Sequence, residues 1–218
     1  MLKPLFGIIF LVLLVIIAGL FVYDFVFSTR AVTKRKLRQH QARLIRYVRE
    51  GETVKVQGEV VADEELLTAP ISGRPCVAWQ VLVRCRDEGD SVKWAEVMNE
   101  EESVPFLLRD RTGQVLIQDP CPNLALDFDE KGSTGLLGEL TPEVIALLAR
   151  QGLAHTDGLG FHRATSWREG IIEPGERIAA MGLACRVQRD TQGGSIFALQ
   201  SNGEQRVLLS DIENTMDG

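Results

Sequence analysis

The apolar residues of this chain follow two patterns, an unbroken run near the start and alternation with polar residues over most of the rest. From Leu5 to Tyr23, 19 successive positions carry no charge. As a helix they would span roughly 28 Å, close to the hydrocarbon core of a bilayer at about 30 Å. Pro4 suits the first turn of such a helix, and the aromatic residues up to Phe27 suit the headgroup level. The run predicts a transmembrane anchor over residues 1–27.

A cleaved secretory signal is the competing interpretation of this run. Such signals have apolar cores of about 7–15 residues, a basic start and a cleavage site of small residues. Here the core is longer, the start carries only Lys3, and large residues from Phe21 to Phe27 stand where a cleavage motif would lie. We therefore expect an anchor that is not cleaved.

A basic segment follows the apolar run. Residues 1–50 hold 9 of the 24 Lys and Arg residues but only 2 of the 30 Asp and Glu residues. Because Lys and Arg close to a span stay on the cytoplasmic side, we expect a single-pass protein with its N-terminus outside and its C-terminal domain in the cytoplasm. The expected location is the cytoplasmic (inner) membrane, and the mitochondrial outer membrane is the alternative.

The basic segment is expected to form a juxtamembrane helix within residues 28–50. Leu37, Leu44, Ile45 and Val48 recur at near-helical spacing over Lys34–Arg49, before a glycine that can end the helix. Its cations either cover a solvated face and set the orientation, or attract anionic headgroups at about 1 kcal/mol each. The candidates for contact with the membrane surface are Arg30, Lys34, Arg35, Lys36, Arg38 and Arg43.

Beyond Gly51 the pattern changes from helical spacing to alternation. Strands are predicted at Val54–Val60, Val77–Cys85, Lys93–Met98, Arg177–Val187, Ser195–Leu199 and Gln205–Leu209. Phe106–Leu108 and Val115–Ile117 predict a hairpin, whose turn needs a left-handed residue that Gly113 can supply. One helix is expected to begin after Thr141 and to end at Gly152.

A short sequence repeat points to the fold class. Gly51–Gly58 and Gly175–Gly182 share the pattern G-E-x-[V/I]-x-[V/A]-x-G. A glycine inside a strand marks a place where side-chain bulk is excluded, and strands that coil into small barrels use such bends. The expected fold is mainly β (α+β), an OB-like or partly closed β barrel with one inserted helix over residues 51–210, followed by a polar tail over residues 211–218.

The charge of the domain limits its partners. Residues 51–218 hold 15 basic and 28 acidic residues, a net charge of −13. A nucleic-acid surface needs a basic footprint, so no nucleic-acid partner is expected.

The segments Gly132–Gly135 and Gly158–Gly160 lack the lysine and the spacing of a phosphate-binding loop and are interpreted as turns. No cofactor or metal is expected.

Three residues of a glycine-flanked loop, His155, Asp157 and His162, are the only group that resembles a metal or acid–base site. Loops often carry function, but polar loop residues are commonplace, so a role as ligands is the less favoured interpretation.

The remaining conspicuous side chains are expected to be structural. Four scattered cysteines give no disulfide framework, and Cys76 and Cys85 are expected to be buried small hydrophobes rather than nucleophiles. Trp79, Trp94 and Trp167 are expected to pack in the core or on a sheet face. The run Glu100–Glu102 is expected to be a solvated loop.

One segment resembles a known family. The stretch L-T-A-P-I-S-G-R-P-C-V-A-W-Q-V at Leu67–Val81, with Trp94, Pro105–Gly113 and Glu173–Gly182, is similar to the GIDE or beside-a-membrane (BAM) domain. That domain belongs to mitochondrial membrane-anchored ubiquitin ligases and their prokaryotic relatives. The resemblance covers roughly Gly51–Leu209 and implies a domain that lies beside a membrane.

The resemblance does not carry ligase activity to this chain. The eukaryotic ligases end in a RING, which needs eight Cys or His ligands in closely spaced pairs for two zinc ions. This sequence holds four Cys and three His, with no pair at ligand spacing. A link to a ubiquitin-type E3 system is therefore implied by resemblance only.

The function predicted from the sequence is that of a membrane-anchored module without enzymatic activity. Its expected partners are the lipid bilayer and an unidentified protein, to which it presents a strand edge or a loop surface. Three alternatives stay open: a component of a ubiquitin-type ligase system, a hydrolase that uses the loop His155–His162, and a domain that senses anionic lipid.

Overall fold

The computed structural model describes residues 28–63, 65–86, 94–134, 139–153, 164–189 and 194–216. The expected anchor over residues 1–27 lies outside these ranges, as do His155, Asp157 and His162. Among the described residues, no helix is both long enough and apolar enough to cross a bilayer.

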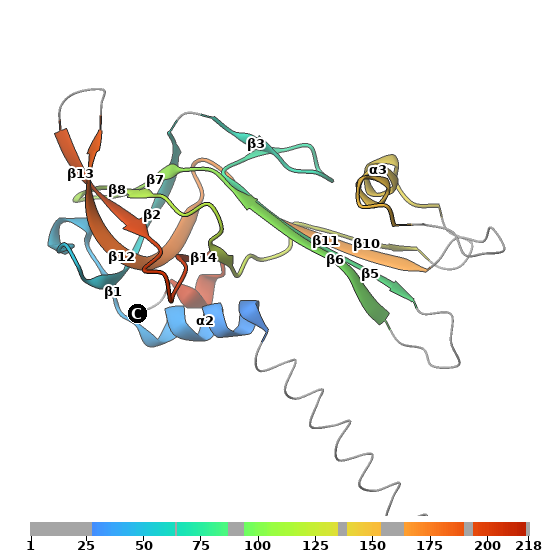
Figure 1. The fold of residues 1–218 in the computed structure, drawn as a ribbon, viewed down its shortest axis with the longest axis horizontal. Coiled ribbons are helices and arrows are strands. Elements are labelled where there is room, and N and C mark those ends of the chain that lie inside the picture. Colours follow the sequence, from blue (N-terminus) through green and yellow to red (C-terminus); the bar gives the residue numbers. More distant parts are fainter. Residues whose placement is uncertain are drawn as a thin grey trace, which may run out of the picture.

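The described chain is mainly β, with helices α2 (Thr29–Gln39) and α3 (Pro142–Arg150) (Figure 1). Its largest sheet is mixed and runs in the order β1-β2-β7-β8-β13-β12-β14-β9, with an additional pairing between β2 and β12. Its strands are β1 (Ala42–Arg43), β2 (Thr53–Ala62), β7 (Phe106–Asp110), β8 (Gly113–Ile117), β9 (Asn123–Leu124), β12 (Arg177–Arg189), β13 (Gly194–Gln200) and β14 (Leu208–Ser210). The pairings thus lead from β2 through β7, β8, β13 and β12 back to β2.

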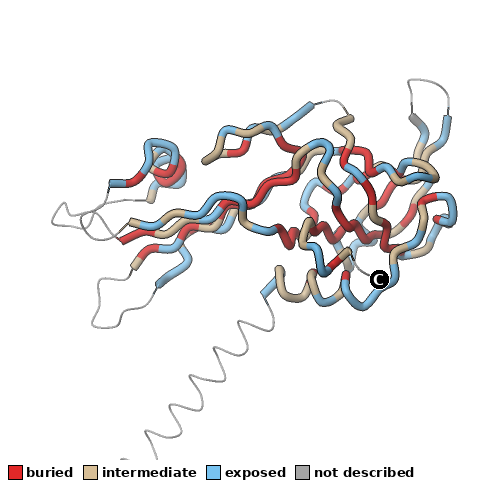
Figure 2. Tube along the Cα trace, turned by 180° about the vertical axis from the view of Figure 1, so that it is seen from behind, coloured by how far each residue is buried: buried red, intermediate tan, exposed pale blue. Residues whose placement is uncertain are grey.

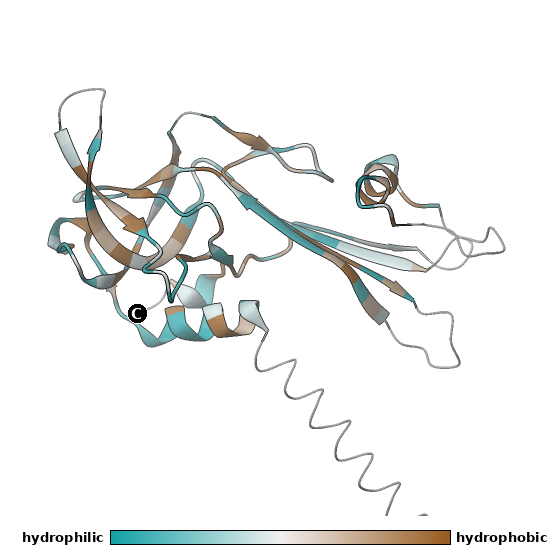
Figure 3. Cartoon of the chain, viewed as in Figure 1, coloured by the Kyte–Doolittle hydropathy of each residue, from teal (hydrophilic) through white to brown (hydrophobic). Residues whose placement is uncertain are grey.

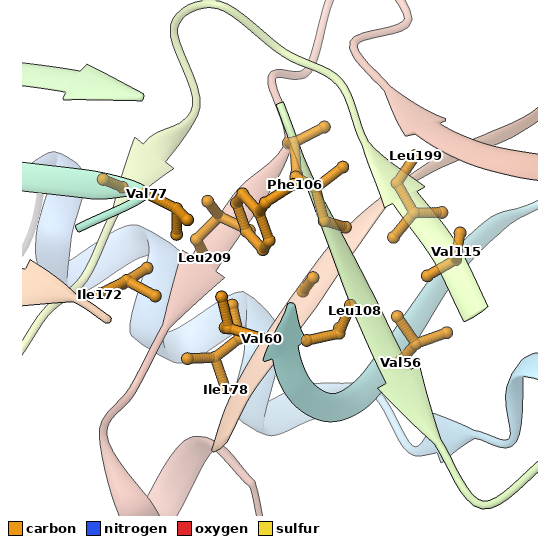
Figure 4. Close-up of a cluster of buried hydrophobic side chains, with 14 of the residues drawn as sticks. Val56, Val60, Val77, Phe106, Leu108, Val115, Ile172, Ile178, Leu199 and Leu209 are labelled. Atoms are coloured by element: carbon orange, nitrogen blue, oxygen red, sulfur yellow. The ribbon is translucent and has the colours of Figure 1, made fainter. Parts of the chain in front are cut away.

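The first hydrophobic core lies between these strands. Figure 4 shows inward-pointing side chains that meet from β2, β7, β8, β12, β13 and β14: Val56, Val60, Phe106, Leu108, Val115, Ile178, Leu199 and Leu209. All of these side chains are at most 1% exposed. Burying one such side chain stabilises the fold by about 1.5–3 kcal/mol. The burial of the apolar side chains that alternate along these strands therefore holds the strands together.

A second, antiparallel sheet extends from the first core. It consists of β10 (Glu130–Thr134), β11 (Thr165–Ile172), β5 (Ala78–Arg86) and β6 (Trp94–Ser103), in that order. Ala78 and Ile172 belong to the first core, and further along, Trp79, Val81 and Ile171 form a second core with α3. Buried residues therefore run without a break from one sheet into the other (Figure 2). A small hairpin of β3 (Leu67–Thr68) and β4 (Pro75–Cys76) lies beside α3 over the same sheet face.

The two copies of the sequence repeat pair with each other. β2 and β12 are antiparallel, with Gly58 opposite Ile178 and Val54 opposite Gly182. The Gly51 N–H donates to the Ala184 carbonyl at 2.8 Å, and the equivalent Gly175 N–H donates to the Val60 carbonyl at 2.8 Å. Both Gly51 and Gly175 have positive φ, 81° and 89°, which favours glycine where the chain turns into each strand. The repeat therefore forms an approximately two-fold symmetric strand pair.

The glycine that ends the first copy is needed for close packing. A Cβ atom at Gly58 would lie 2.4 Å from the backbone oxygen of Arg109 on the neighbouring strand β7. Because a backbone atom cannot move aside cheaply, the expected exclusion of side-chain bulk is confirmed at this position.

Gly58→Ala is expected to lower the free energy of unfolding by about 1–3 kcal/mol, because the strand must shift away from β7. The measurement is thermal unfolding of the full chain in detergent micelles. Gly194→Ala is the matched control, since a Cβ atom there meets nothing within 4 Å and the φ of Gly194 is not positive. Equal melting temperatures for the two variants would contradict the prediction.

The first described helix is shorter than the sequence pattern predicted. A helix was expected over Lys34–Arg49, but α2 covers Thr29–Gln39 and is followed by β1 and a 3₁₀ turn at Ile45–Tyr47. Ile45 and Val48 are buried in the first core, and the Ile45 N–H donates to Asp110 Oδ2 at 2.8 Å. The apolar residues Ile45 and Val48 beyond α2 therefore pack in the first core, between the strands, and do not form the apolar face of a helix.

Helix α2 packs along the domain instead of standing off as a stalk. Although it is coloured mostly hydrophilic in Figure 3, its Leu37 is fully buried against Ala179, Met181 and Leu208. The helix contacts β9, β12, β14 and the 3₁₀ turn at Glu213–Thr215. Ser28 caps its first turn, since Ser28 Oγ accepts the Ala31 N–H at 3.3 Å.

Most predicted strands are confirmed, and three local predictions are wrong. β2, β5, β12, β13, the hairpin β7–β8 and the helix α3 all lie where the pattern placed them.

Glu100–Glu102 continue β6 instead of forming a loop, because an edge strand leaves such side chains in solvent. Gly132–Thr134 lie in β10 and not in a turn. Gly113 is not left-handed, since Asp110 Oδ1 closes that turn by accepting the Thr112 and Gly113 N–H groups.

The start of α2 contacts the loop before β10. The guanidinium of Arg30 lies 4.2 Å from the ring centre of Phe128, and that of Arg168 on β11 lies 5.6 Å from the same ring. Next to the ring, the Asp127 N–H donates to Asp211 Oδ1 at 2.7 Å. Burial, together with the nearby carboxylates of Glu176 and Asp129, raises the pKa of Asp211 to about 7.

Asp211→Asn is expected to stabilise the protein at about pH 8 by on the order of 1–3 kcal/mol. The raised pKa means that the folded protein holds a proton that the unfolded chain loses above its ordinary pKa of 3.8. The contribution of Asp211 to the free energy of unfolding therefore falls as the pH rises from about 4 to about 7. Asparagine still accepts the Asp127 N–H and carries no charge.

The measurement is chemical unfolding of the full chain at about pH 4.5 and about pH 8. The gain of Asp211→Asn should be much smaller at the lower pH. Glu213→Gln, at an exposed position of the adjacent 3₁₀ turn, is the control and should show no such dependence. A gain of equal size at both pH values would refute a role for the Asp211 charge.

Candidate functional site

A groove of about 990 Å³ lies between the β3–β4 turn, the edge strand β6 and helix α3. Trp79 and Leu147, which are 8% and 2% exposed, contribute apolar surface at its base. The turn contributes Pro70 and Ile71 from the opposite side. The groove is thus apolar at its base and open to solvent along β6.

Strand β6 offers an unpaired edge along this groove. One edge of β6 pairs with β5, and within the described ranges no strand pairs with the other. Glu102 lies opposite Trp79 and Glu100 opposite Val81, so both carboxylates are on the sheet face that forms the groove. Exposed strand edges accept an extended segment by adding it as a further strand.

Acidic side chains dominate the rim of the groove. Four glutamates line it, namely Glu100, Glu101, Glu102 and Glu143. The groove also holds two arginines, Arg150 and Arg206. The net charge of these six side chains is negative, so the groove favours a ligand that carries positive charge.

A buried carboxylate fixes the turn that forms one wall. Glu169 on β11 is fully buried, and its two oxygens accept the Ile71 and Ser72 N–H groups at 2.7 and 2.9 Å. Charge-assisted hydrogen bonds of this kind are about twice as strong as neutral ones. The wall is therefore held in one position before any ligand binds.

Further contacts close the same turn. The guanidinium of Arg74 forms a bidentate ion pair with the Glu173 carboxylate. The Gly73 N–H donates to the Ala69 carbonyl at 3.0 Å, and Gly73 has a φ of 69°. The segment Leu67–Val81, on which the predicted resemblance to the GIDE/BAM domain rests, thus consists of this wall and the start of β5.

Two of the cysteines, Cys76 and Cys85, are buried, whereas Cys121 lines the groove and is exposed. Burial, reinforced by the carboxylates of Glu169 and Glu173, raises the pKa of the Cys76 thiol to about 12. Cys85 is also buried, and its sulfur lies 3.6 Å from Thr165 Oγ1. Both cysteines are buried in or next to strands, as the sequence predicted, and a thiol with so high a pKa is a poor nucleophile.

The three tryptophans have different environments. Trp79 is buried in the second core and Trp167 packs against it, as expected. Trp94 is 45% exposed at the start of β6, so it lies on the sheet and not in the core. The first position of an edge strand has neighbours on one side only, which explains this exposure.

The basic residues of the predicted membrane surface lie on α2 and β1. Arg35, Arg38 and Arg43 are exposed, whereas Arg30, Lys34 and Lys36 are partly buried. Arg43 also pairs with Glu52 at 2.6 Å. Contact of these residues with lipid stays a prediction.

The loop with His155, Asp157 and His162 lies outside the described residues, so its predicted role is untested. Among the residues that the structure does describe, no group of three or more His, Cys, Asp or Glu side chains could hold a metal ion. The groove was not identified from the sequence, because Glu169 and the turn that it binds are 98 residues apart. The apolar neighbours Ile171 and Ile172 were the only local sign of a buried strand there.

No protein-family model matches the sequence, and no curated protein and no solved structure is similar to it. The resemblance to the GIDE/BAM domain therefore stays a prediction from its motif. The function has to be inferred from the chemistry of the groove itself.

Glu169→Gln is expected to lower the free energy of unfolding by about 2–3 kcal/mol, because the new amide group cannot accept the second N–H of the turn. Thermal unfolding of the full chain in detergent measures this effect. Glu96→Gln is the control, since the exposed pair of Glu96 with Arg84 at 3.9 Å should contribute less than about 1 kcal/mol. A loss no larger than that of the control would show that Glu169 does not hold the wall.

Proposed function

We propose that this protein is a membrane-anchored interaction module that binds an extended, basic protein segment in the groove beside β6. The observation that carries the proposal is that the unpaired edge of β6 borders an acidic groove. The opposite wall of this groove, the β3–β4 turn, is held in place by Glu169. The bound segment would add a strand to β6 and place its cationic side chains against Glu100 and Glu102.

The position of the module beside a membrane is part of the proposal. It is supported by the uncharged run Leu5–Tyr23 and by the basic residues that follow it. We infer a single-pass protein of the cytoplasmic membrane with the domain in the cytoplasm. The partner would then be a cytoplasmic protein or the cytoplasmic part of another membrane protein.

An OB-like barrel is the fold that we propose for the ring of strands. If the strands β2, β7, β8, β12 and β13 are numbered in chain order, their pairings follow the order 1-2-3-5-4-1. A small barrel of five strands with long insertions matches this arrangement and supports the proposed likeness to the GIDE/BAM domain. The second sheet and α3 are built from the insertions.

Binding of a defined peptide tests the proposed function. The probe is a short peptide in which lysine and valine alternate, titrated against the full chain in neutral detergent. Glu100→Gln with Glu102→Gln is expected to weaken binding by about 5- to 30-fold, because two contacts of roughly 0.5–1 kcal/mol each are lost. The new amide at position 100 can still accept the hydrogen bond that Gln151 donates to Glu100, so the fold should be unaffected.

Two controls separate strand addition from simple attraction of opposite charges. Glu204→Gln with Glu213→Gln removes the same charge at exposed positions outside the groove and should change the affinity by less than about twofold. The same peptide with N-methylated alternate amides should not bind, because it cannot donate to the β6 edge. Equal binding of the methylated peptide, or equal losses in the two double variants, would refute the proposal.

A further inference from the structure

A second groove, of about 680 Å³, lies at the ring of strands and has the opposite charge. It is formed by β1, the middle of β2, the β7–β8 turn and the start of β12. Four arginines from three separate parts of the chain line it: Arg43, Arg109, Arg111 and Arg177. These parts of the chain are far apart in the sequence and become neighbours only in the folded protein.

The backbone around this groove is held in place by Asp110. Its Oδ1 accepts the Thr112 and Gly113 N–H groups, and its Oδ2 accepts the Ile45 N–H from the segment that follows β1. Its Oδ1 also accepts the Thr112 hydroxyl, so the carboxylate of Asp110 is committed to donors within the fold. It joins the β7–β8 turn to the chain that leaves α2, and so fixes Arg43 relative to Arg111.

The four guanidinium groups are only partly neutralised. Arg43 pairs with Glu52 at 2.6 Å, and Arg109 pairs with Glu59 at 3.2 Å. Both pairs are exposed and therefore weak enough to rearrange around a ligand. For Arg111 and Arg177, which are exposed, the described part of the chain holds no carboxylate within ion-pair distance.

The chemistry of this groove suits a phosphate group. The planar guanidinium offers parallel N–H donors that match two phosphate oxygens, and several arginines together can neutralise a doubly charged anion. The domain around the groove has a net charge of −13 over residues 51–218 and repels anions in general. An anion would bind only where local cations outweigh that charge, which is what the four arginines provide.

We propose that this groove binds a phosphate-bearing ligand, either the headgroup of a lipid or a soluble phosphorylated molecule. Its volume exceeds that of one phosphate and leaves room for the group that carries it. Arg43 lies four residues beyond the end of α2, which is about 16 Å long. The groove thus lies beyond the end of α2 that is farther from the predicted anchor.

Two probes distinguish the two sources of phosphate. Inorganic pyrophosphate and a water-soluble, short-chain phosphatidylinositol phosphate are titrated separately against the full chain in neutral detergent, with binding followed by calorimetry. Arg111→Gln with Arg177→Gln should weaken binding by at least about tenfold, because two charge-assisted contacts are removed. Arg84→Gln with Lys131→Gln removes the same charge from exposed positions of the second sheet and should change the affinity by less than about twofold.

Binding of pyrophosphate alone would identify a soluble ligand, and binding of the lipid alone would identify a headgroup. Binding of both, with the same loss in the groove variant, would identify the phosphate itself as the recognised group. If neither probe binds, or if both double variants lose affinity equally, the proposal is overturned. Unchanged melting temperatures of the variants exclude misfolding as the cause of a loss.

Discussion

The antiparallel pairing of β2 with β12 is the contact on which the rest of the structure depends. It joins the two copies of the repeat, and it turns a row of strands into a ring because β2 is also paired with β7. Its ends are fastened symmetrically, since Gly51 and Gly175 each donate to the carbonyl of the partner strand. Only glycine adopts the left-handed backbone of these two positions without strain.

The same pairing explains why the second sheet exists. Because Glu59 lies opposite Arg177, the end of β2 and the start of β12 are adjacent. The chain leaves the ring after β2 to build β3–β6, and it returns to the ring before β12 after building β11. The first excursion therefore leaves the ring, and the second returns to it, at the same end, where β5 and β11 pair along eight residues from Ala78 to Cys85. The groove beside β6 is a product of this arrangement.

The sequence predicted the parts of the fold that are governed by local pattern. Strands such as β2 and β12 alternate, and α3 has its own start and stop signals between Thr141 and Gly152. Strand β11 was missed because Arg168 and Glu169 interrupt its apolar pattern, although Glu169 is fully buried. The negative charge of Glu169 is stabilised by backbone N–H groups of a turn 98 residues away. No local pattern in the sequence can reveal such a contact. Both grooves are missed for the same reason, since their charged residues come from distant segments.

Helix α2 is held against the body of the domain at its start, its middle and its end. Its first turn is held by the contact of Arg30 with Phe128, next to β10 and β11 of the second sheet. Its middle is held by Leu37 in the ring, and its far end continues into β1 and Arg43 of the cationic groove. A rotation of α2 against the body would expose Leu37 and break the aromatic contact together. The orientation of α2 relative to both grooves is therefore set by packing.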